Sequence, residues 1–507
     1  MVSIPKTKNV RYGWTIGLVL FALLVIGIAL RFYRLGELPP GLFFDEGANA
    51  MDALGILQGN YAVFFPRHFG REGLIMYLIA GAVHLLGRTI VAERLPAALA
   101  SLLTPLALIW LGQVLFSTLP SPSSTETGRR WQALLWATVA AGLAATSLQL
   151  TIIGRGGLRV NLLPLLLVVA VAGLVSGLQR KSRWRLLVAA FATGLMPYTY
   201  IPARFFPLFL LLLAASIVWQ QRLSWTVIRS YVRELLLYLG GSLLIALPIL
   251  VHFALHPADF FSRSNALMIT ALPASEGDLF RALLINAYDH LAALGWKGDP
   301  NWRHNYALRP LLTVGEAICF WTGLGWAMVH WRMLTARLLL LLFAVLMIPV
   351  VLALDYPPDT FRMVPLMPVV YLVISIGLWQ IVGWGGRLFK SKGGDGWRTQ
   401  MMLFALLGGS QMGIKLVDTW QIYYHQWANE PEVYQIYNSE WTDLVNTVNA
   451  IPPASAISYV VPIGNQYDAN FEMYNFSYLY QSHNACQSVL CPCRHDCSDD
   501  PIAVASR

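Results

Sequence analysis

The sequence predicts an all-α polytopic membrane protein, on the evidence of its composition, its apolar segments and its basic loops. Of the 507 residues, 56% are hydrophobic and only 12% are charged, against ~25% in ordinary soluble domains. The mean hydropathy is +0.54. A soluble fold of this composition would expose large apolar patches, and a disordered chain has the opposite composition. Both of these classes are therefore excluded.

Apolar segments occupy most of the first 420 residues. They lie at 13–30, 73–87, 95–117, 131–153, 160–178, 186–200, 204–219, 235–255, 311–329, 338–354, 363–384 and 399–417. Most of them approach the ~17–25 residues that a membrane-spanning helix requires. The first is long for the apolar part of a signal peptide and has no small-x-small cleavage site, so we expect it to remain as a membrane helix.

Basic residues between the segments indicate the cytoplasmic loops, because these loops retain Lys and Arg. The clusters are Lys6, Lys8 and Arg11; Arg129 and Arg130; Arg180, Lys181, Arg183 and Arg185; Arg222, Arg229 and Arg233; Arg332 and Arg337; and Arg387, Lys390, Lys392 and Arg398. The sides alternate consistently only if segment 73–87 does not cross the membrane. That segment is short and carries His84, so we expect an interfacial helix on the outer face.

About eleven crossings remain, with the N-terminus in the cytoplasm and the C-terminus outside. Residues 1–420 form the predicted membrane domain, and residues 421–507 form a small extracytoplasmic α+β domain. The outer face receives long loops at 31–94 and 256–310 and short ones at 154–159, 201–204 and 355–362. The net charge of +9 follows from the same charge bias, so no nucleic-acid partner is expected. Nearly all polar residues without a membrane role collect on the outer side.

Two adjacent carboxylates, Asp45 and Glu46, stand in the first outer loop among aromatic residues and Gly47. Partial burial beside a like charge raises the pKa of a carboxylate, which suits a group that must take up a proton. Acids at this position also fit the N-terminal cap of the helix expected over 49–58. Position alone leaves both roles open.

Arginines on the outer side run against the charge bias and require anionic partners. They are Arg71, Arg155, Arg159, Arg204, Arg303 and Arg362. Arg71 opens an apolar helix at headgroup depth, where a guanidinium binds a lipid phosphate or anchors the helix by snorkelling. Arg155 and Arg159 lie in a short, glycine-rich loop, and their partner is either a ligand or the two carboxylates.

Two further outer segments carry candidates for contact with a sugar or an acceptor. Tyr198 and Tyr200 form part of an aromatic belt or stack on a sugar ring. The string from Gly298 to Asn305 places many hydrogen-bonding side chains beside a tryptophan, as in a carbohydrate- or phosphate-binding loop. Its candidates are Asp299, Asn301, His304 and Asn305. A solvated turn explains the first four residues of this string but not the whole of it.

The tail after residue 420 is polar. The pattern predicts an amphipathic helix starting at Asn438 and a strand over 456–461. Asn475 begins a formal glycosylation sequon, a pattern that also arises by chance. Four cysteines, at Cys486, Cys491, Cys493 and Cys497, lack the paired spacing of a zinc site, so two disulfides are expected on the outer side, with a metal site as the less favoured alternative.

An acidic pair after the first helix, followed by an interfacial helix that opens with a basic residue, resembles the GT-C superfamily of integral-membrane glycosyltransferases. The resemblance is to the protein O-mannosyltransferase and aminoarabinose-transferase branch, family 39. The strings Gly70-Arg71-Glu72, Tyr198-Thr199-Tyr200 and Gly298 to Asn305 look like a bacterial subgroup of that branch. The resemblance covers roughly residues 10–420 in topology, and only short motifs are specific.

The resemblance implies transfer of a sugar from a polyprenyl-phosphate donor to an acceptor hydroxyl at the outer face of a bacterial plasma membrane. Asp45 matches the acid/base aspartate, and Glu46 matches its companion carboxylate. Arg71 stands where relatives often carry a Lys before two prolines, as a phosphate contact. Arg155 and Arg159 replace the Asp-x-Asp metal motif of some relatives, so no cofactor and no divalent metal are expected.

The same residues fit the chemistry without the resemblance. A leaving phosphate requires cationic stabilisation, and an attacking hydroxyl requires a base, here Asp45. Attack opposite the phosphate predicts inversion at the anomeric carbon. The acceptor is a protein, lipid or glycan. Two other readings remain: a transporter or flippase for a lipid-linked saccharide, which predicts internal repeats and midplane polar groups, and an inactive scaffold that presents the tail.

Overall fold

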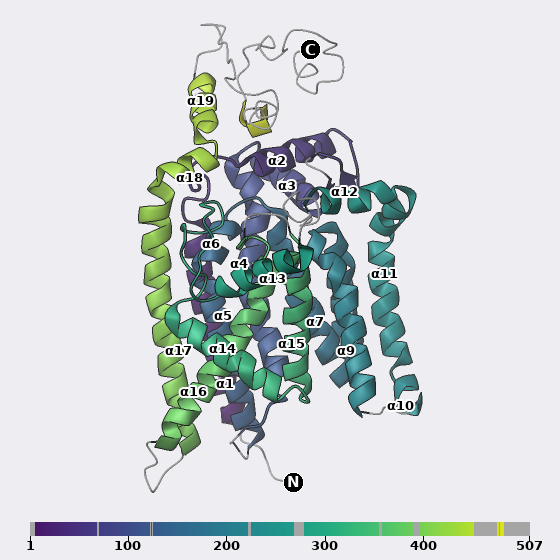
Figure 1. Cartoon of the computed structure of the whole chain (residues 1–507), viewed down its shortest axis with the longest axis vertical. Coiled ribbons are helices and arrows are strands. Elements are labelled where there is room, and N and C mark those ends of the chain that lie inside the picture. Colours follow the sequence, from purple (N-terminus) through teal and green to yellow (C-terminus); the bar gives the residue numbers. More distant parts are fainter. Residues whose placement is uncertain are drawn as a thin grey trace.

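The computed structural model describes residues 6–67, 70–121, 123, 125–221, 225–267, 278–353, 357–388, 396–450, 474–475 and 477–480. Within these ranges the chain is a bundle of helices with one small pair of strands (Figure 1). Most of the long helices follow the long axis of the molecule, and α2 and α3 lie at its upper end in Figure 1. The predicted class, a helical membrane protein, is confirmed.

The helices follow one another with short connections. The first part of the chain forms α1 (Lys6–Phe32), α2 (Phe44–Leu57), α3 (Leu74–Leu86), α4 (Ile90–Phe116), α5 (Glu126–Ala145), α6 (Leu148–Gly154), α7 (Leu162–Arg180), α8 (Arg183–Leu195), α9 (Phe206–Gln221), α10 (Trp225–Arg229) and α11 (Val232–Leu255). The second part forms α12 (Pro257–Leu267), α13 (Leu279–Ala292), α14 (Val314–Val329), α15 (Leu334–Val351), α16 (Met367–Leu388), α17 (Gly396–Gln421), α18 (Pro431–Ile436) and α19 (Ser439–Asn449).

Local capping fixes where several helices begin. The Thr89 hydroxyl accepts a hydrogen bond from the Ala92 N–H at 3.1 Å and starts α4. Thr313 and Glu316 form a reciprocal capping box at the start of α14. Such caps satisfy the backbone N–H groups that the first helical turn leaves without partners.

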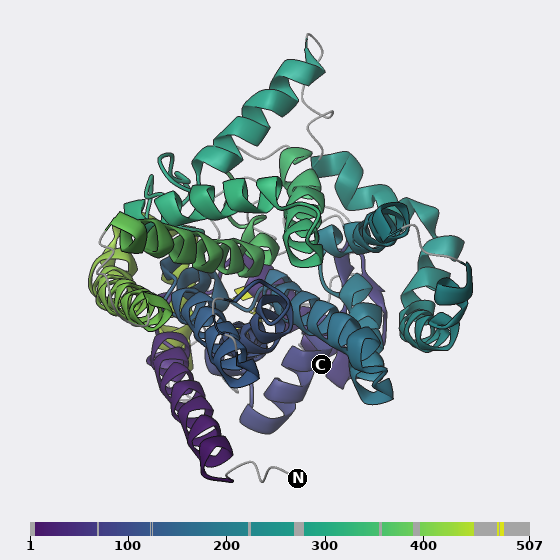
Figure 2. The ribbon, with the colours of Figure 1, turned by 90° about the horizontal axis from the view of Figure 1, so that it is seen from below.

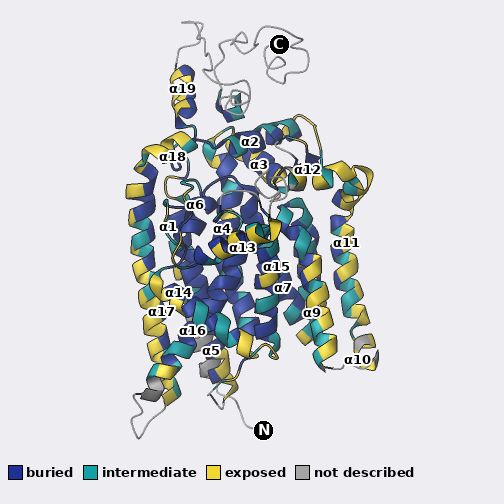
Figure 3. Cartoon of the chain, viewed as in Figure 1, coloured by how far each residue is buried: buried dark blue, intermediate teal, exposed yellow. Residues whose placement is uncertain are grey.

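The buried core runs along the central helices, and small residues let them approach closely (Figure 3). Where α14 crosses α16, a Cβ on Gly377 would lie 1.8 Å from the carbonyl oxygen of Cys319, and one on Gly323 would lie 2.1 Å from that of Val373. Close contact at small residues is typical of helix pairs in membranes.

The outer helices carry exposed apolar side chains toward the surroundings, as lipid contact requires. Exposed leucines and valines occur on α9, α11 and α17. In the view from below, α11 and α17 lie on opposite sides of the bundle (Figure 2). These faces therefore surround the buried core on more than one side.

Six helices in the described ranges are long and apolar enough to cross a membrane, and the pair α5 and α6, bent by 57°, would be a seventh if it forms one span. Further apolar stretches at Gly17–Phe32, Leu74–Leu86 and Val314–Val329 are shorter. The eleven crossings therefore stay a prediction. The short length of α3 and its place at the end of the bundle agree with the expected interfacial helix.

The one strand pair in the described residues positions two charged side chains. Strand β1 (Phe64–Phe65) pairs antiparallel with β2 (Arg71–Glu72), with Phe64 opposite Glu72. The connection turns at Gly70, whose φ of +89° is unfavourable for residues with a Cβ, and the Phe64 ring would lie 2.2 Å from such an atom. The sequence analysis did not predict this hairpin.

The described part of the tail packs on the loop that leads into α2. Helix α19 begins at Ser439, directly after Asn438, as predicted. Residues 474–475 and 477–480 are called here the C-terminal strap. Asn475 Nδ2 donates to the Leu42 carbonyl of that loop at 2.5 Å, and Arg88 Nε, between α3 and α4, donates to the Tyr478 carbonyl at 3.0 Å. The predicted strand at 456–461 and the four cysteines lie outside the described residues.

Candidate functional site

Asp45 lies in the first turn of α2, which begins at Phe44, earlier than the sequence predicts. Its carboxylate is 23% exposed, and its Oδ2 lies 3.8 Å from an Nη of Arg303. The carboxylate thus lies at the N-terminal end of α2 beside this guanidinium, and part of it remains accessible to solvent.

Glu46 has a different environment from its neighbour, and this corrects its expected role as a second catalytic carboxylate. Its side chain is wholly buried and accepts hydrogen bonds from the Phe43 N–H at 2.8 Å, the Gly157 N–H at 2.9 Å and Arg94 Nε at 3.1 Å. The capping alternative left open by the sequence describes Glu46. It joins α2, α4 and the loop after α6, and it does not reach a substrate.

Arg71 extends from β2 into a buried polar cluster with α2. It donates to Asn49 Oδ1 at 2.5 Å and pairs with Asp52, which also lies 3.3 Å from Arg67. Burial lowers the pKa of Arg71, and the charges of Asp52 and Asp45 oppose that shift. The guanidinium is therefore fixed near Asp45 by the neighbouring helix.

Glu72, the next residue, joins two more of the predicted arginines. Its carboxylate lies 3.0 Å from Arg159 and 3.1 Å from Arg204. Arg204 also lies over the Phe260 ring, 4.4 Å from its centroid, and Arg159 lies 5.8 Å from that of Tyr200. One carboxylate thus holds guanidinium groups that come from two separate outer connections.

Arg263 on α12 belongs to the same cluster, and the sequence analysis did not single it out. Burial lowers its pKa to about 10, with Arg159 adding to the shift and Asp45 opposing it. The signal was present, because Arg263 is an arginine in the outer loop 256–310 and opposes the charge bias like the others. It links the Glu72 group to Asp45.

Arg155 does not join this cluster, contrary to the expectation of a phosphate contact. All five of its N–H groups donate within the protein. The acceptors are the hydroxyls of Tyr423 at 2.8 Å and Tyr424 at 3.0 Å and the carbonyls of Leu30, Tyr33 and Leu38. A guanidinium has five donors in all. Arg155 is therefore saturated, and it ties the end of α1 to the chain after α17.

The two predicted tyrosines have separate environments. Tyr200 is buried in the cluster, and its ring centroid lies 6.0 Å from that of Phe361. Tyr198 donates its hydroxyl to the Ile245 carbonyl at 2.9 Å and so joins α8 to α11. Both of these contacts are with other protein groups, and only Tyr200 lies beside the charged residues.

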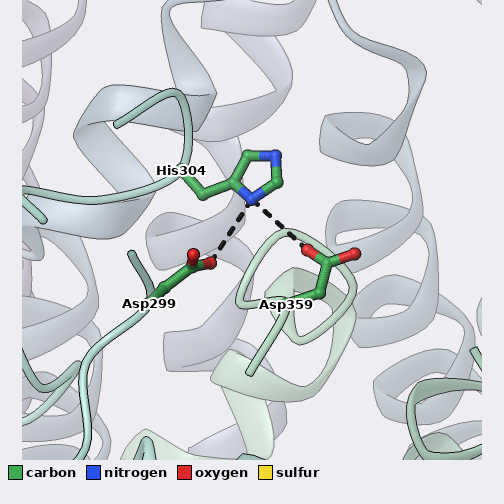
Figure 4. A group of neighbouring side chains, drawn as sticks. All are labelled: Asp299, His304 and Asp359. Carbon is green, nitrogen blue, oxygen red and sulfur yellow. Dashed lines mark hydrogen bonds and ion pairs between the residues drawn. The ribbon is translucent and has the colours of Figure 1, made fainter. Parts of the chain in front are cut away.

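Around His304, the candidates from the second outer loop form a buried network (Figure 4). His304 Nδ1 lies 3.3 Å from both Asp299 and Asp359. The sequence analysis did not single out Asp359. Asp299 accepts from the Thr360 N–H at 2.8 Å and hydroxyl at 2.7 Å, and Arg362 Nε donates to Asp359 at 2.9 Å. Arg362 is thus held by Asp359.

The other polar members of this loop also bond within the protein. Asn301 Oδ1 accepts from the Arg303 N–H at 3.0 Å, and Asn305 donates to the Arg309 carbonyl. Asp299 is 1% exposed, His304 4% and Asn305 2%. For Asp299, His304 and Asn305, burial and internal partners indicate structural roles in place of the expected contact with sugar or acceptor, whereas Asn301 is only partly buried.

The oxygen and nitrogen atoms of Asp299, His304 and Asp359 lie within 4.8 Å of one another, as metal ligands would. Their chemistry does not suit a cation. Arg303 Nε donates to His304 Nε2 at 2.9 Å, so the proton of the neutral ring sits on Nδ1, the atom that would face the metal. The carboxylate oxygens already accept N–H and O–H groups. We therefore assign no step to a metal.

No protein-family model matches the sequence. No curated protein matches it either. Solved structures do resemble the fold. ArnT from Cupriavidus metallidurans bound to undecaprenyl phosphate has a TM-score of 0.54 at 13% identity, covering 93% of this chain and 86% of that one. The archaeal oligosaccharyltransferase AglB from Archaeoglobus fulgidus has a TM-score of 0.48 at 14% identity, and the chain covers 61% of its length.

The likeness to ArnT extends over 93% of the chain. At this identity it shows the fold alone. The chain is a helical membrane protein whose fold is similar to that of ArnT. The assignment to the GT-C superfamily and to its mannosyltransferase branch stays a prediction.

Proposed function

We propose that this chain is a glycosyltransferase of the GT-C class that moves a sugar from a polyprenyl-phosphate donor to an acceptor hydroxyl on the extracytoplasmic side. The observation that carries the proposal is a partly exposed carboxylate, Asp45, at a helix N-terminus beside a cluster of guanidinium groups from separate elements. The similarity of the fold to that of ArnT supports the class of reaction.

The guanidinium cluster supplies the site for the donor phosphate. Its guanidinium groups outnumber its carboxylates, so the cluster keeps an excess of positive charge that an anionic ligand would compensate. The guanidinium groups belong to Arg67, Arg71, Arg159, Arg204, Arg263, Arg303 and Arg362. The carboxylates belong to Asp45, Asp52, Glu72, Asp299 and Asp359. Bidentate N–H donors suit phosphate oxygens.

Asp45 is the proposed general base. The acceptor hydroxyl gives its proton to the Asp45 carboxylate as its oxygen forms a bond to the anomeric carbon. The bond from that carbon to the donor phosphate breaks, and its electron pair leaves with the polyprenyl phosphate, which the arginines stabilise. Attack from the side opposite the phosphate inverts the anomeric configuration. A positioned base contributes typically ~10²–10⁴-fold to such a step.

The finer topology belongs to the same proposal. Eleven crossings, a cytoplasmic N-terminus and an outer C-terminus place Asp45, the arginines and the C-terminal strap on one side of a bacterial plasma membrane. Residues 1–420 would carry the reaction, and residues 421–507 would form the outer domain. The proposal also includes membership of the family-39 branch and a mannosyl-type sugar. The acceptor would be a protein, lipid or glycan, and the reaction would not depend on a metal.

The test uses purified protein in nanodiscs. Binding of undecaprenyl phosphate and transfer from a panel of polyprenyl-phosphate sugars are measured for the wild type, Arg159→Gln and Glu126→Gln. Glu126 is an exposed partner of Arg130 and serves as the control. We expect Arg159→Gln to weaken binding about tenfold (~1.4 kcal/mol) and Glu126→Gln to match the wild type. Lipid movement across the bilayer without sugar transfer would instead identify the transporter.

A further inference from the structure

Arg303 is held in one orientation beside Asp45. Its guanidinium lies over the rings of Phe43 and Phe361, 4.1 and 5.2 Å from their centroids, and its Nε donates to His304 Nε2 at 2.9 Å. One Nη lies 3.8 Å from Asp45 Oδ2. The side chain is only 16% exposed. The aromatic contacts restrain its plane, and the bond to His304 restrains its rotation.

The hydrogen bonds of His304 define a single neutral tautomer. Nε2 accepts the Arg303 N–H, so it carries no proton. Nδ1 lies 3.3 Å from one oxygen each of Asp299 and Asp359, which are acceptors when ionised, so it carries the proton. A doubly protonated ring would direct an N–H at Arg303 and lose that bond. The carboxylates therefore select the tautomer that can accept from the arginine.

The network around the ring is itself fixed. Thr360 donates to Asp299 through both its backbone N–H and its hydroxyl, and Arg362 holds Asp359. The Phe361 ring stacks on the imidazole at 5.1 Å between centroids. Residues about sixty positions apart in the chain thus meet at one histidine, and its Nε2 is the ring nitrogen that contacts Arg303.

We propose that His304 is a positioning residue for the reaction: held as the Nδ1–H tautomer by Asp299 and Asp359, it orients Arg303 against Asp45 through Nε2. This rests on the proposed function, in which Asp45 is the base. His304 touches neither donor nor acceptor and acts only through Arg303. A tilt of the guanidinium would move the positive charge away from the base, and misplacement by ~1 Å can cost ~10²-fold in rate.

The tautomer is measured first, without reference to turnover. Protein with ¹⁵N-labelled histidine is studied by NMR in nanodiscs, and the His304 signals are assigned by their loss in His304→Asn. We expect a neutral ring with a protonated Nδ1 and an unprotonated Nε2 at neutral pH. Arg303→Gln should shift the Nε2 signal. A ring protonated at Nε2, or at both nitrogens, would overturn the proposal.

The kinetic experiment compares two substitutions, each of which keeps a polar group near one of the two ring nitrogens of the histidine. His304→Gln retains a polar acceptor near the position of Nε2, whereas His304→Asn retains a polar group only near Nδ1. We expect His304→Asn to lower kcat by ~10²-fold with KM for the donor little changed, Arg303→Gln to lower kcat at least as far, and His304→Gln to restore most of the loss. The midpoint of thermal unfolding is recorded for every variant. If His304 has a merely structural role, kcat should fall in proportion to this midpoint.

The double variant His304→Asn/Arg303→Gln decides whether the two residues act as a unit. Coupled residues give losses that do not add, so we expect the double variant to match Arg303→Gln within a few-fold. Multiplied losses of ~10⁴-fold would show that His304 acts independently of Arg303 and would contradict the proposal. The wild type could also show the expected tautomer, and the expected shift of the Nε2 signal in Arg303→Gln, but transfer no sugar. That result would count against the proposed transferase reaction.

Discussion

At the residue scale, Arg155 and Arg159 show how a partner decides the role of a charge. They stand four positions apart in one outer loop, and the sequence presents them alike. Arg155 uses every donor on carbonyls of the α1 end and on Tyr423 and Tyr424. Arg159 pairs with a single carboxylate, Glu72, and retains donors for a ligand. The difference comes from contacts with residues between 87 and 269 positions away in the chain.

This contrast predicts separate effects of matched substitutions. We expect Arg155→Gln to lower the free energy of unfolding by about 3 kcal/mol, because it removes a wholly buried charge from its partners. Arg159→Gln should cost less stability and should weaken undecaprenyl phosphate binding. Thermal unfolding in detergent and binding in nanodiscs measure the two effects. A stable Arg155→Gln protein with weakened binding would show that Arg155 belongs to the phosphate site.

Asp359 gives a second prediction at this scale. Burial alone would raise the pKa of Asp359, but the ring N–H of His304 and the charges of Arg362 and Arg303 lower it below its usual value. A carboxylate with a lower pKa in the folded state stabilises the fold above its unfolded value of ~3.9 and loses this contribution as the pH falls through the folded value. The midpoint difference between wild type and Asp359→Asn should be steady near neutral pH and shrink in acid. An undiminished difference at about pH 3 would contradict this account.

At the element scale, the hairpin of β1 and β2 explains why neighbouring residues of opposite charge serve one site. In a strand, successive side chains point to opposite faces. Arg71 therefore reaches Asp52 on α2, while Glu72 reaches Arg159 and Arg204. The sequence analysis placed Arg71 at a helix start, because the paired residues are too few to show a strand pattern. The sharp turn at Gly70 is what brings β2 back onto β1.

Gly70 and Gly59 provide a matched test of this element. Both have positive φ values, +89° and +97°, but a Cβ at Gly70 would meet the Phe64 ring at 2.2 Å, whereas one at Gly59 has no neighbour within 4 Å. Both alanine variants carry the backbone strain, and only Gly70→Ala also displaces β2. We expect undecaprenyl phosphate binding to fall about tenfold in Gly70→Ala alone. Equal losses in the two variants would separate the hairpin from the phosphate site.

At the scale of the whole molecule, the tail contacts the start of α2, which carries Asp45, and the loop that leads into it. The C-terminal strap places Asn475 against Gly47, two residues beyond Asp45, and Tyr437 lies against Gly41 on the other side of the loop. The sequon at Asn475 is consequently not an accessible glycosylation site, since the side chain is buried and bonded to Leu42. The tail thus helps to fix the position of the proposed base.

Two glycines of α2 test this arrangement. A Cβ at Gly47 would lie 2.0 Å from Asn475 Oδ1, whereas one at Gly55 has its nearest contact at 3.7 Å. Alanine at Gly55 should stabilise the helix by up to ~1 kcal/mol, and alanine at Gly47 should displace the strap and lower both the unfolding midpoint and turnover. Proteolysis of the tail measures the displacement. An equally protected tail in Gly47→Ala would contradict the contact.

The sequence predicted the class of protein well, but it did not predict which residues the individual polar side chains contact. Apolar segments and basic loops predicted a helical membrane protein, and the predicted Arg71, Arg159, Arg204 and Arg303 do lie in or beside one group of charged residues. The sequence did not indicate that Glu46 and Arg155 are saturated. Their partners, Arg94 and Tyr423, come from distant helices, and no local pattern shows that two polar groups will meet in a buried position.

The central claim is that Asp45 takes the acceptor proton while the arginines hold the phosphate. It is tested most directly by single-turnover sugar transfer in nanodiscs with wild type and Asp45→Asn, together with the Kd of each for undecaprenyl phosphate. We predict a transfer rate lower by ~10²–10⁴-fold in Asp45→Asn and a Kd close to that of the wild type. Transfer at the wild-type rate in Asp45→Asn would contradict the account.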